Sequence, residues 1–232
     1  MKNRNNIHPA TVFFILWWAI AILSWVGSIY SWNGVRSIIS AEALRWLLRY
    51  TEEYVMSSPV LYGVIILFIG GGLFVDSGLK SAILRLLNRD RSLSGKERKS
   101  LMVSSAVALF YSSVFAVLLW GPWNIVRGVT GRFDDSPLHD GALYVLSLGV
   151  GLVSLVYAFS ADYYRRDSDI VRGMSYLFSK HSSYLVSLFF AIQFMAAFRY
   201  TGLDKAAGLS DMAYQIMYYF CCIIPIFCKR TK

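Results

Sequence analysis

Three residues of this 232-residue chain stand in or beside long apolar stretches and could bind a solute or an ion. Gln193 lies inside an apolar stretch, and its amide can both donate and accept hydrogen bonds. Arg199 directly follows that stretch and could bind an anion, while Asp76 closes an earlier stretch and could bind a coupling cation. Polar groups at membrane depth are costly and commonly mark solute or ion pathways. We therefore take Gln193 and Arg199 as candidate substrate-binding residues and Asp76 as a candidate ion-coupling residue.

Each of these residues also has a purely structural interpretation. Gln193 could form a hydrogen bond between helices, which is worth about 1 kcal/mol in a membrane. Arg199 could extend its guanidinium to the bilayer interface while its stem stays in hydrocarbon. Asp76 stands at a helix end, where it can stay hydrated and serve the helix terminus. The residues alone leave both sets of roles open.

Catalytic and metal chemistry lack the residues that they require. His139 stands beside Asp140, and His181 stands apart, so neither has the second and third groups of a triad or a metal site. No nucleophile paired with a base is visible, which predicts that the chain is not an enzyme. All three cysteines fall in the last apolar stretch, at Cys221, Cys222 and Cys228, and are interpreted as packing residues. We expect no cofactor and no metal.

Six apolar stretches must position these side chains. Most are close to the roughly 20 residues that a helix needs to cross a bilayer. A content of 56% hydrophobic residues and a mean hydropathy of +0.48 exclude an ordinary soluble domain. The sequence predicts an all-α polytopic membrane protein with about six transmembrane helices in a single transmembrane domain over residues 1–232. The predicted spans are Pro9–Tyr30, Ser58–Val75, Leu101–Trp120, Ala142–Ala161, Tyr184–Phe198 and Met212–Cys228.

The basic residues predict the orientation of these spans. Most of the 23 Lys and Arg residues precede the first span, follow the second or fourth span, or form the tail, whereas the other connections carry few. The positive-inside rule therefore places both termini in the cytoplasm. This sorting accounts for the formal net charge of +9 without a nucleic-acid partner, and the lipid bilayer is the expected surrounding.

Some polar connections read as short helices. Ser40 is a good N-cap for an amphipathic interfacial helix, and residues 77–87 repeat that pattern on the side predicted to be cytoplasmic. Ser94 and Glu97 have the spacing of a capping box that opens the third span.

Two blocks of the chain resemble the aminobenzoyl-glutamate transporter (AbgT) family of bacterial inner-membrane carriers. The first block contains HPAT at 8–11, SAEALRW at 40–46, PVLYGV at 59–64 and GGGLFVDSGL at 70–79. The second contains SGKERKSL at 94–101, SPL at 136–138, DSDIVRGM at 167–174, YLVSLFFAIQF at 184–194 and FRYTGL at 198–203. Their order matches the order in family members, whose last motif reads YxVLxFFxAQFxxxFxxSNLG. Gln193 falls on the Gln of that motif, whereas Arg199 and Gly202 stand where Asn is usual.

The resemblance implies cation-driven secondary transport, by sodium or protons, of p-aminobenzoyl-glutamate or a related aromatic amino-acid conjugate, in a homodimer of the bacterial inner membrane. Family members have a long middle section with a re-entrant hairpin between the two blocks, which here abut at about Arg85–Ser94. A second hairpin and closing helices would follow the second block. The runner-up hypothesis is therefore a shortened, non-transporting scaffold or interaction subunit, or a remnant of a carrier, completed by another membrane subunit if at all.

Overall fold

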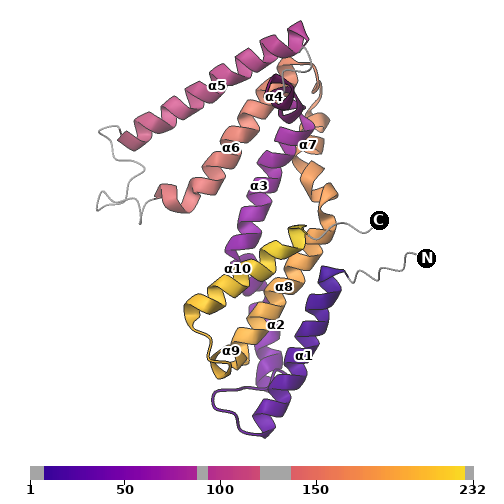
Figure 1. Cartoon of the computed structure of the whole chain (residues 1–232), viewed down its shortest axis with the longest axis vertical. Helices are drawn as coiled ribbons and strands as arrows, with labels where there is room; N and C mark the ends of the chain where they lie inside the picture. Colours follow the sequence, from indigo (N-terminus) through magenta and orange to yellow (C-terminus); the bar gives the residue numbers. More distant parts are fainter. Residues whose placement is uncertain (1–7, 88–93, 121–136, 228–232) are drawn as a thin grey trace, which may run out of the picture. The chain divides into compact units, whose positions relative to one another are not determined.

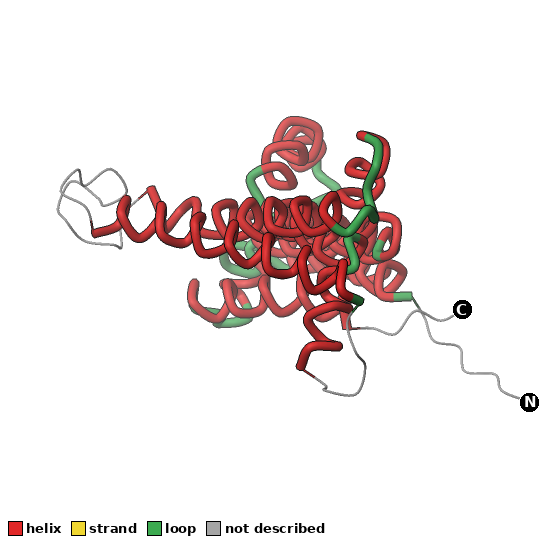
Figure 2. The backbone as a smooth tube through the Cα atoms, turned by 90° about the horizontal axis from the view of Figure 1, so that it is seen from above, coloured by secondary structure: helices red, strands yellow, loops and turns green. Residues whose placement is uncertain are grey.

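The computed structural model describes residues 8–87, 94–120 and 137–227, with side chains described from residue 141 in the last range. Every regular element in these ranges is a helix (Figure 2). Five helices are long and apolar enough to cross a membrane: α1 (Pro9–Ile29), α3 (Pro59–Asp76), α5 (Gly95–Trp120), α6 (Pro137–Ser160) and α8 (Ser182–Tyr200). The sixth predicted span corresponds to α10 (Asp211–Phe227), which is apolar but shorter. The expectation of an all-α polytopic membrane protein is confirmed.

The remaining helices are short or amphipathic. They are α2 (Ala41–Met56), α4 (Leu79–Leu87), α7 (Asp167–Lys180) and α9 (Leu203–Ala206). The Ser40 side chain accepts from the Ala43 amide and so caps α2, as predicted. The Ser94 amide donates to Glu97 at 3.0 Å, which completes the predicted box at the start of α5.

The chain divides into two compact units. The first contains residues up to 62 and from 181 onward, and the second contains residues 63–180. In the first unit α8 packs along α1, and α2 and α10 also contact α8 (Figure 1). The core of this packing is formed by Ile20, Ala21, Ile38, Ala43, Ala197 and Leu203.

Backbone contact fixes the turn after α8 in the first unit. The Arg36 amide donates to the Thr201 carbonyl at 2.9 Å, so the segment after α1 lies against the end of α8. Gly202 has a φ of +72°, and a Cβ there would also collide with the Gly34 carbonyl. Glycine thus stands at this position, where the family's motif has Asn, for a backbone reason.

In the second unit α3 is packed tightly against α6 and α7. A Cβ at Gly70 would come 2.5 Å from the Ser147 carbonyl oxygen, and one at Gly72 would come 2.6 Å from the Gly173 carbonyl oxygen. Two clusters extend this packing, one around Leu73, Ala158 and Tyr164 and one around Leu79, Ala82 and Tyr157. By contrast α5, which contacts α6 and α4, is the least buried of the five candidate spans.

Candidate functional site

Asp76 ends α3, and its carboxylate is occupied by two partners in the second unit. The Tyr164 hydroxyl donates to Oδ2 of Asp76 at 2.9 Å, and Nε of Arg172 lies 3.5 Å from the same oxygen. The Asp76 side chain is only 15% exposed, so a cation would have to share this oxygen with both partners. The network therefore ties the end of α3 to the segment before α7 and to α7 itself.

The first turn of α7 positions Arg172 in this network. The backbone amides of Arg165 and Arg166 donate to Oδ2 of Asp169, which lowers the pKa of that carboxyl, with a smaller contribution from Arg172. Nη1 of Arg172 lies 3.0 Å from Oδ1 of Asp169, which directs the guanidinium toward Asp76. Burial, followed by the hydrogen bond to Asp76, raises the pKa of Tyr164. Tyr164 is therefore a hydrogen-bond donor, not a proton carrier, at neutral pH.

Replacing Tyr164 by phenylalanine should lower the free energy of unfolding by about 2 kcal/mol, because a hydrogen bond to a charged, largely buried carboxylate is lost. The control is Tyr163→Phe, since the Tyr163 hydroxyl is exposed and lies 3.4 Å from Glu97. Unfolding by denaturing detergent, followed by circular dichroism, measures both. Equal stability of the two variants would contradict the assigned role of Tyr164.

Arg199 is the centre of a second network, in the first unit. Nη1 lies 2.9 Å from Oδ2 of Asp204, and Nη2 lies 2.6 Å from Oδ1 of Asp211. The guanidinium also lies 4.7 Å from the ring centroid of Tyr214, within the range of a cation–π interaction. The side chain of Asp204 is 1% exposed and that of Asp211 is 79% exposed. Water can therefore solvate the charge of Asp211, whereas the buried charge of Asp204 depends on Arg199 as its counter-ion.

The sequence did not point to these acidic partners. Asp204 follows Arg199 by five positions, which is not a spacing that brings side chains together on one continuous helix. Gly202 breaks α8, and α9 then turns Asp204 back to the guanidinium. The glycine in FRYTGL was the one available signal, because it marks a helix end.

Gln193 is the candidate whose amide group retains unused hydrogen-bonding capacity. Its Nε2 atom is buried and has no hydrogen-bond partner within the described ranges. The structural interpretation of Gln193 requires an acceptor on a neighbouring helix for this nitrogen, because an amide N–H only donates. Among the described residues none is in place.

The remaining candidates form no catalytic or metal-binding group. In the part of the chain that the structure describes, no three His, Cys, Asp or Glu residues converge as metal ligands would. Cys222 is fully buried and Cys221 partly so, in α10, where the Cys222 carbonyl accepts from the Tyr184 hydroxyl at 3.1 Å. Cys228 and the side chains of His139 and Asp140 lie outside the described part.

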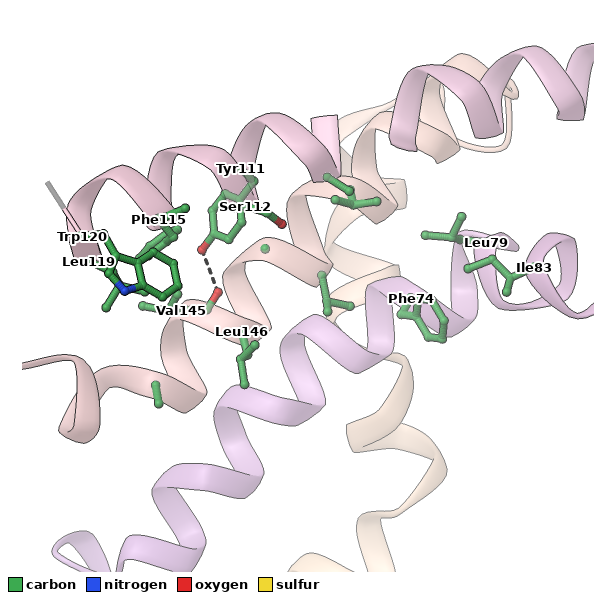
Figure 3. Close-up of a pocket in the computed structure, with 16 residues that line it drawn as sticks. Phe74, Leu79, Ile83, Tyr111, Ser112, Phe115, Leu119, Trp120, Val145 and Leu146 are labelled. Carbon is green, nitrogen blue, oxygen red and sulfur yellow. Dashed lines mark hydrogen bonds between the residues drawn. The ribbon is translucent and has the colours of Figure 1, made fainter. Parts of the chain in front are cut away.

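A pocket of about 640 Å³ opens in the second unit between α3, α4, α5 and α6 (Figure 3). Phe74 and Ile83 form one side, and Tyr111, Phe115 and Leu146 lie opposite. No charged side chain lines this pocket. A solute with carboxylate groups would be desolvated there without a partner, so the pocket does not fit an anionic conjugate.

Comparison with known proteins identifies the family. The model of the AbgT putative transporter family matches residues 86–217, which is more than half of the chain. The chain belongs to the AbgT family. The predicted resemblance to this family is thereby confirmed; the matched residues contain the second block, and the first block lies before them.

Individual relatives of this AbgT-family chain are transport proteins. It is 26% identical over 166 residues to the p-aminobenzoyl-glutamate transport protein of Escherichia coli (strain K12). The aligned region covers 68% of this chain and 32% of that relative. The chain thus spans about a third of the length of this curated relative. Its fold is similar to that of the YdaH transporter of Alcanivorax borkumensis, with a TM-score of 0.72, 14% identity, and coverage of 85% of this chain and 71% of that one. The fold is also similar to that of MtrF of Neisseria gonorrhoeae, which is described with a class of antimetabolite efflux pumps. The TM-score is 0.76 at 16% identity, and the match covers 97% of this chain and 80% of MtrF.

Proposed function

We propose that this multi-pass membrane protein is a cation-driven carrier of p-aminobenzoyl-glutamate or a related aromatic amino-acid conjugate, in the bacterial inner membrane. The observation that carries the proposal is the buried amide nitrogen of Gln193 inside α8, which has no hydrogen-bond partner among the described residues. A buried amide without a partner is costly, and binding a polar solute would remove that cost. The name of the Escherichia coli relative supplies the substrate class.

Arg199 and Asp76 have structural roles in this proposal. Both are held by carboxylate, guanidinium or phenol partners within their own unit, so neither offers a free group to a solute or an ion. Substrate contact is therefore assigned to Gln193, and the residues that contact the coupling ion lie elsewhere. The two units together form the single transmembrane domain, and a homodimer or a complementing membrane subunit supplies the remaining wall of the solute path.

The alternative is a non-transporting scaffold or interaction subunit. It is favoured because Asp76 and Arg199 are both held by partners, which leaves the amide nitrogen of Gln193 as the polar atom without a partner among the three candidates. The two functions differ in one measurable property, which is gradient-driven accumulation of solute.

Proteoliposomes containing only this chain should accumulate radiolabelled p-aminobenzoyl-glutamate when an inward sodium or proton gradient is imposed. Gln193→Met should abolish accumulation while raising the free energy of unfolding by about 1 kcal/mol, because a buried donor without a partner is removed. Loss of activity together with a gain of stability is not expected from a residue that only supports the fold.

The chain's other glutamine provides a matched control. Gln215 is exposed on α10, so Gln215→Met should change neither accumulation nor stability. If the folded wild-type chain shows no accumulation under either gradient, the scaffold alternative replaces the carrier. If Gln193→Met is active and destabilised, Gln193 is a structural residue.

A further inference from the structure

The apolar pocket of the second unit has walls suited to hydrocarbon. Its lining carries no charge, and the Tyr111 hydroxyl is already used because it donates to the Val145 carbonyl at 2.7 Å (Figure 3). Ser112 and the indole N–H of Trp120 are the other polar groups of the lining. Its volume of about 640 Å³ is within the range of pockets that bury small ligands.

The bilayer has access to this pocket through α5. Seven of its lining residues, between Ala108 and Trp120, belong to this helix. Only 6% of the apolar window of α5 is buried, although its composition is that of a membrane span. Lipid chains therefore surround the helix that forms the outer wall, and hydrocarbon is the solvent next to the pocket.

Two cations lie at the α4 end of the pocket. Lys80 directly follows Leu79, which lines the pocket, and Arg98 precedes Leu101 by one turn. Leu101 packs against the cluster that contains Leu79, so both cations flank the same apolar cluster. Both are exposed, and neither forms an ion pair within the described ranges, whereas Arg85 is paired with Glu97 at 3.0 Å.

The geometry of α5 separates Arg98 from its neighbour Lys99. A helix has about 3.6 residues per turn, so Arg98 lies on the same face as Ala116, which lines the pocket, whereas Lys99 is turned away from that direction by about 100°. Arg98 therefore has the position of a headgroup ligand, and Lys99 does not.

We propose that this pocket binds one anionic phospholipid, with an acyl chain between α5 and α6 and the phosphate held by Lys80 and Arg98. Basic residues next to an apolar site between membrane helices favour anionic over zwitterionic headgroups. The headgroup would lie on the side that the basic residues predict to be cytoplasmic.

Native mass spectrometry of the full chain tests this proposal, with dioleoylphosphatidylglycerol and dioleoylphosphatidylcholine added at equal concentration. We expect retention of one phosphatidylglycerol in preference to phosphatidylcholine. Lys80→Gln and Arg98→Gln should each weaken that retention about fivefold, which corresponds to the contribution of one basic residue near a membrane surface. Lys99→Gln should leave it unchanged.

A second pair of variants tests the acyl-chain site. Ala108 lines the pocket, whereas Ala106 is exposed two positions earlier. Ala108→Leu should reduce retention of both lipids, and Ala106→Leu should not, while circular dichroism verifies that both variants fold. Equal retention of the two lipids by the wild-type chain would overturn the proposal. So would a dimer that Ala108→Leu dissociates without any lipid preference, since a second copy would then occupy the pocket.

Discussion

Gly72→Ala should lower the free energy of unfolding by about 2–3 kcal/mol, although alanine is the better helix former. A Cβ at Gly72 would come 2.6 Å from the Gly173 carbonyl oxygen and 3.1 Å from that of Met174, both in α7. Neither atom belongs to a flexible side chain, so α3 and α7 would have to move apart. Separation of these helices would also strain the bond between Tyr164 and Asp76.

The adjacent residue provides a matched control for this substitution. A Cβ at Gly71 would meet the end of the Leu177 side chain at 3.1 Å, and that side chain can adjust. Gly71→Ala should therefore change the stability by no more than about 0.5 kcal/mol. Both variants are measured by unfolding in mixed micelles, with tryptophan fluorescence as the signal. Equal stability of the two variants would show that α3 and α7 do not touch as described.

Arg199→Met should destabilise the protein by about 3 kcal/mol, because it leaves the buried carboxylate of Asp204 without its partner. Asp211 is exposed and forms only a surface ion pair, so Asp211→Asn should cost less than about 1 kcal/mol. Thermal unfolding in detergent separates these two effects.

A double variant distinguishes the structural role of Arg199 from substrate binding. Arg199→Met combined with Asp204→Asn removes both charges, so it should recover much of the lost stability. If accumulation of p-aminobenzoyl-glutamate recovers with the stability, Arg199 acts through the fold. If stability recovers and accumulation does not, Arg199 contacts the solute, which would overturn the structural role assigned to it.

The class of the protein and the approximate positions of its helices could be predicted from the amino-acid sequence. Long apolar stretches leave a helix as the main way to satisfy the backbone inside a bilayer, so the spans were readable from composition and length. Caps such as Ser40 and the pair of Ser94 and Glu97 depend on residues within one turn, and these were predicted correctly. The family was also recognisable, because motif order is a property of the sequence.

The partners of the candidate side chains could not be predicted, because they depend on how the helices pack. Asp76 receives its donors from Tyr164 and Arg172, about 90 positions later along the chain, and such pairings cannot be read from local spacing. Arg199 is neutralised by residues that follow a break in α8, and the direction of that break is set by the backbone at Gly202. Gln193 was visible as a polar residue in an apolar helix, but whether its amide finds a partner depends on the helices packed around α8. Side-chain roles in a membrane bundle follow from contacts between helices, which the pattern along one helix does not contain.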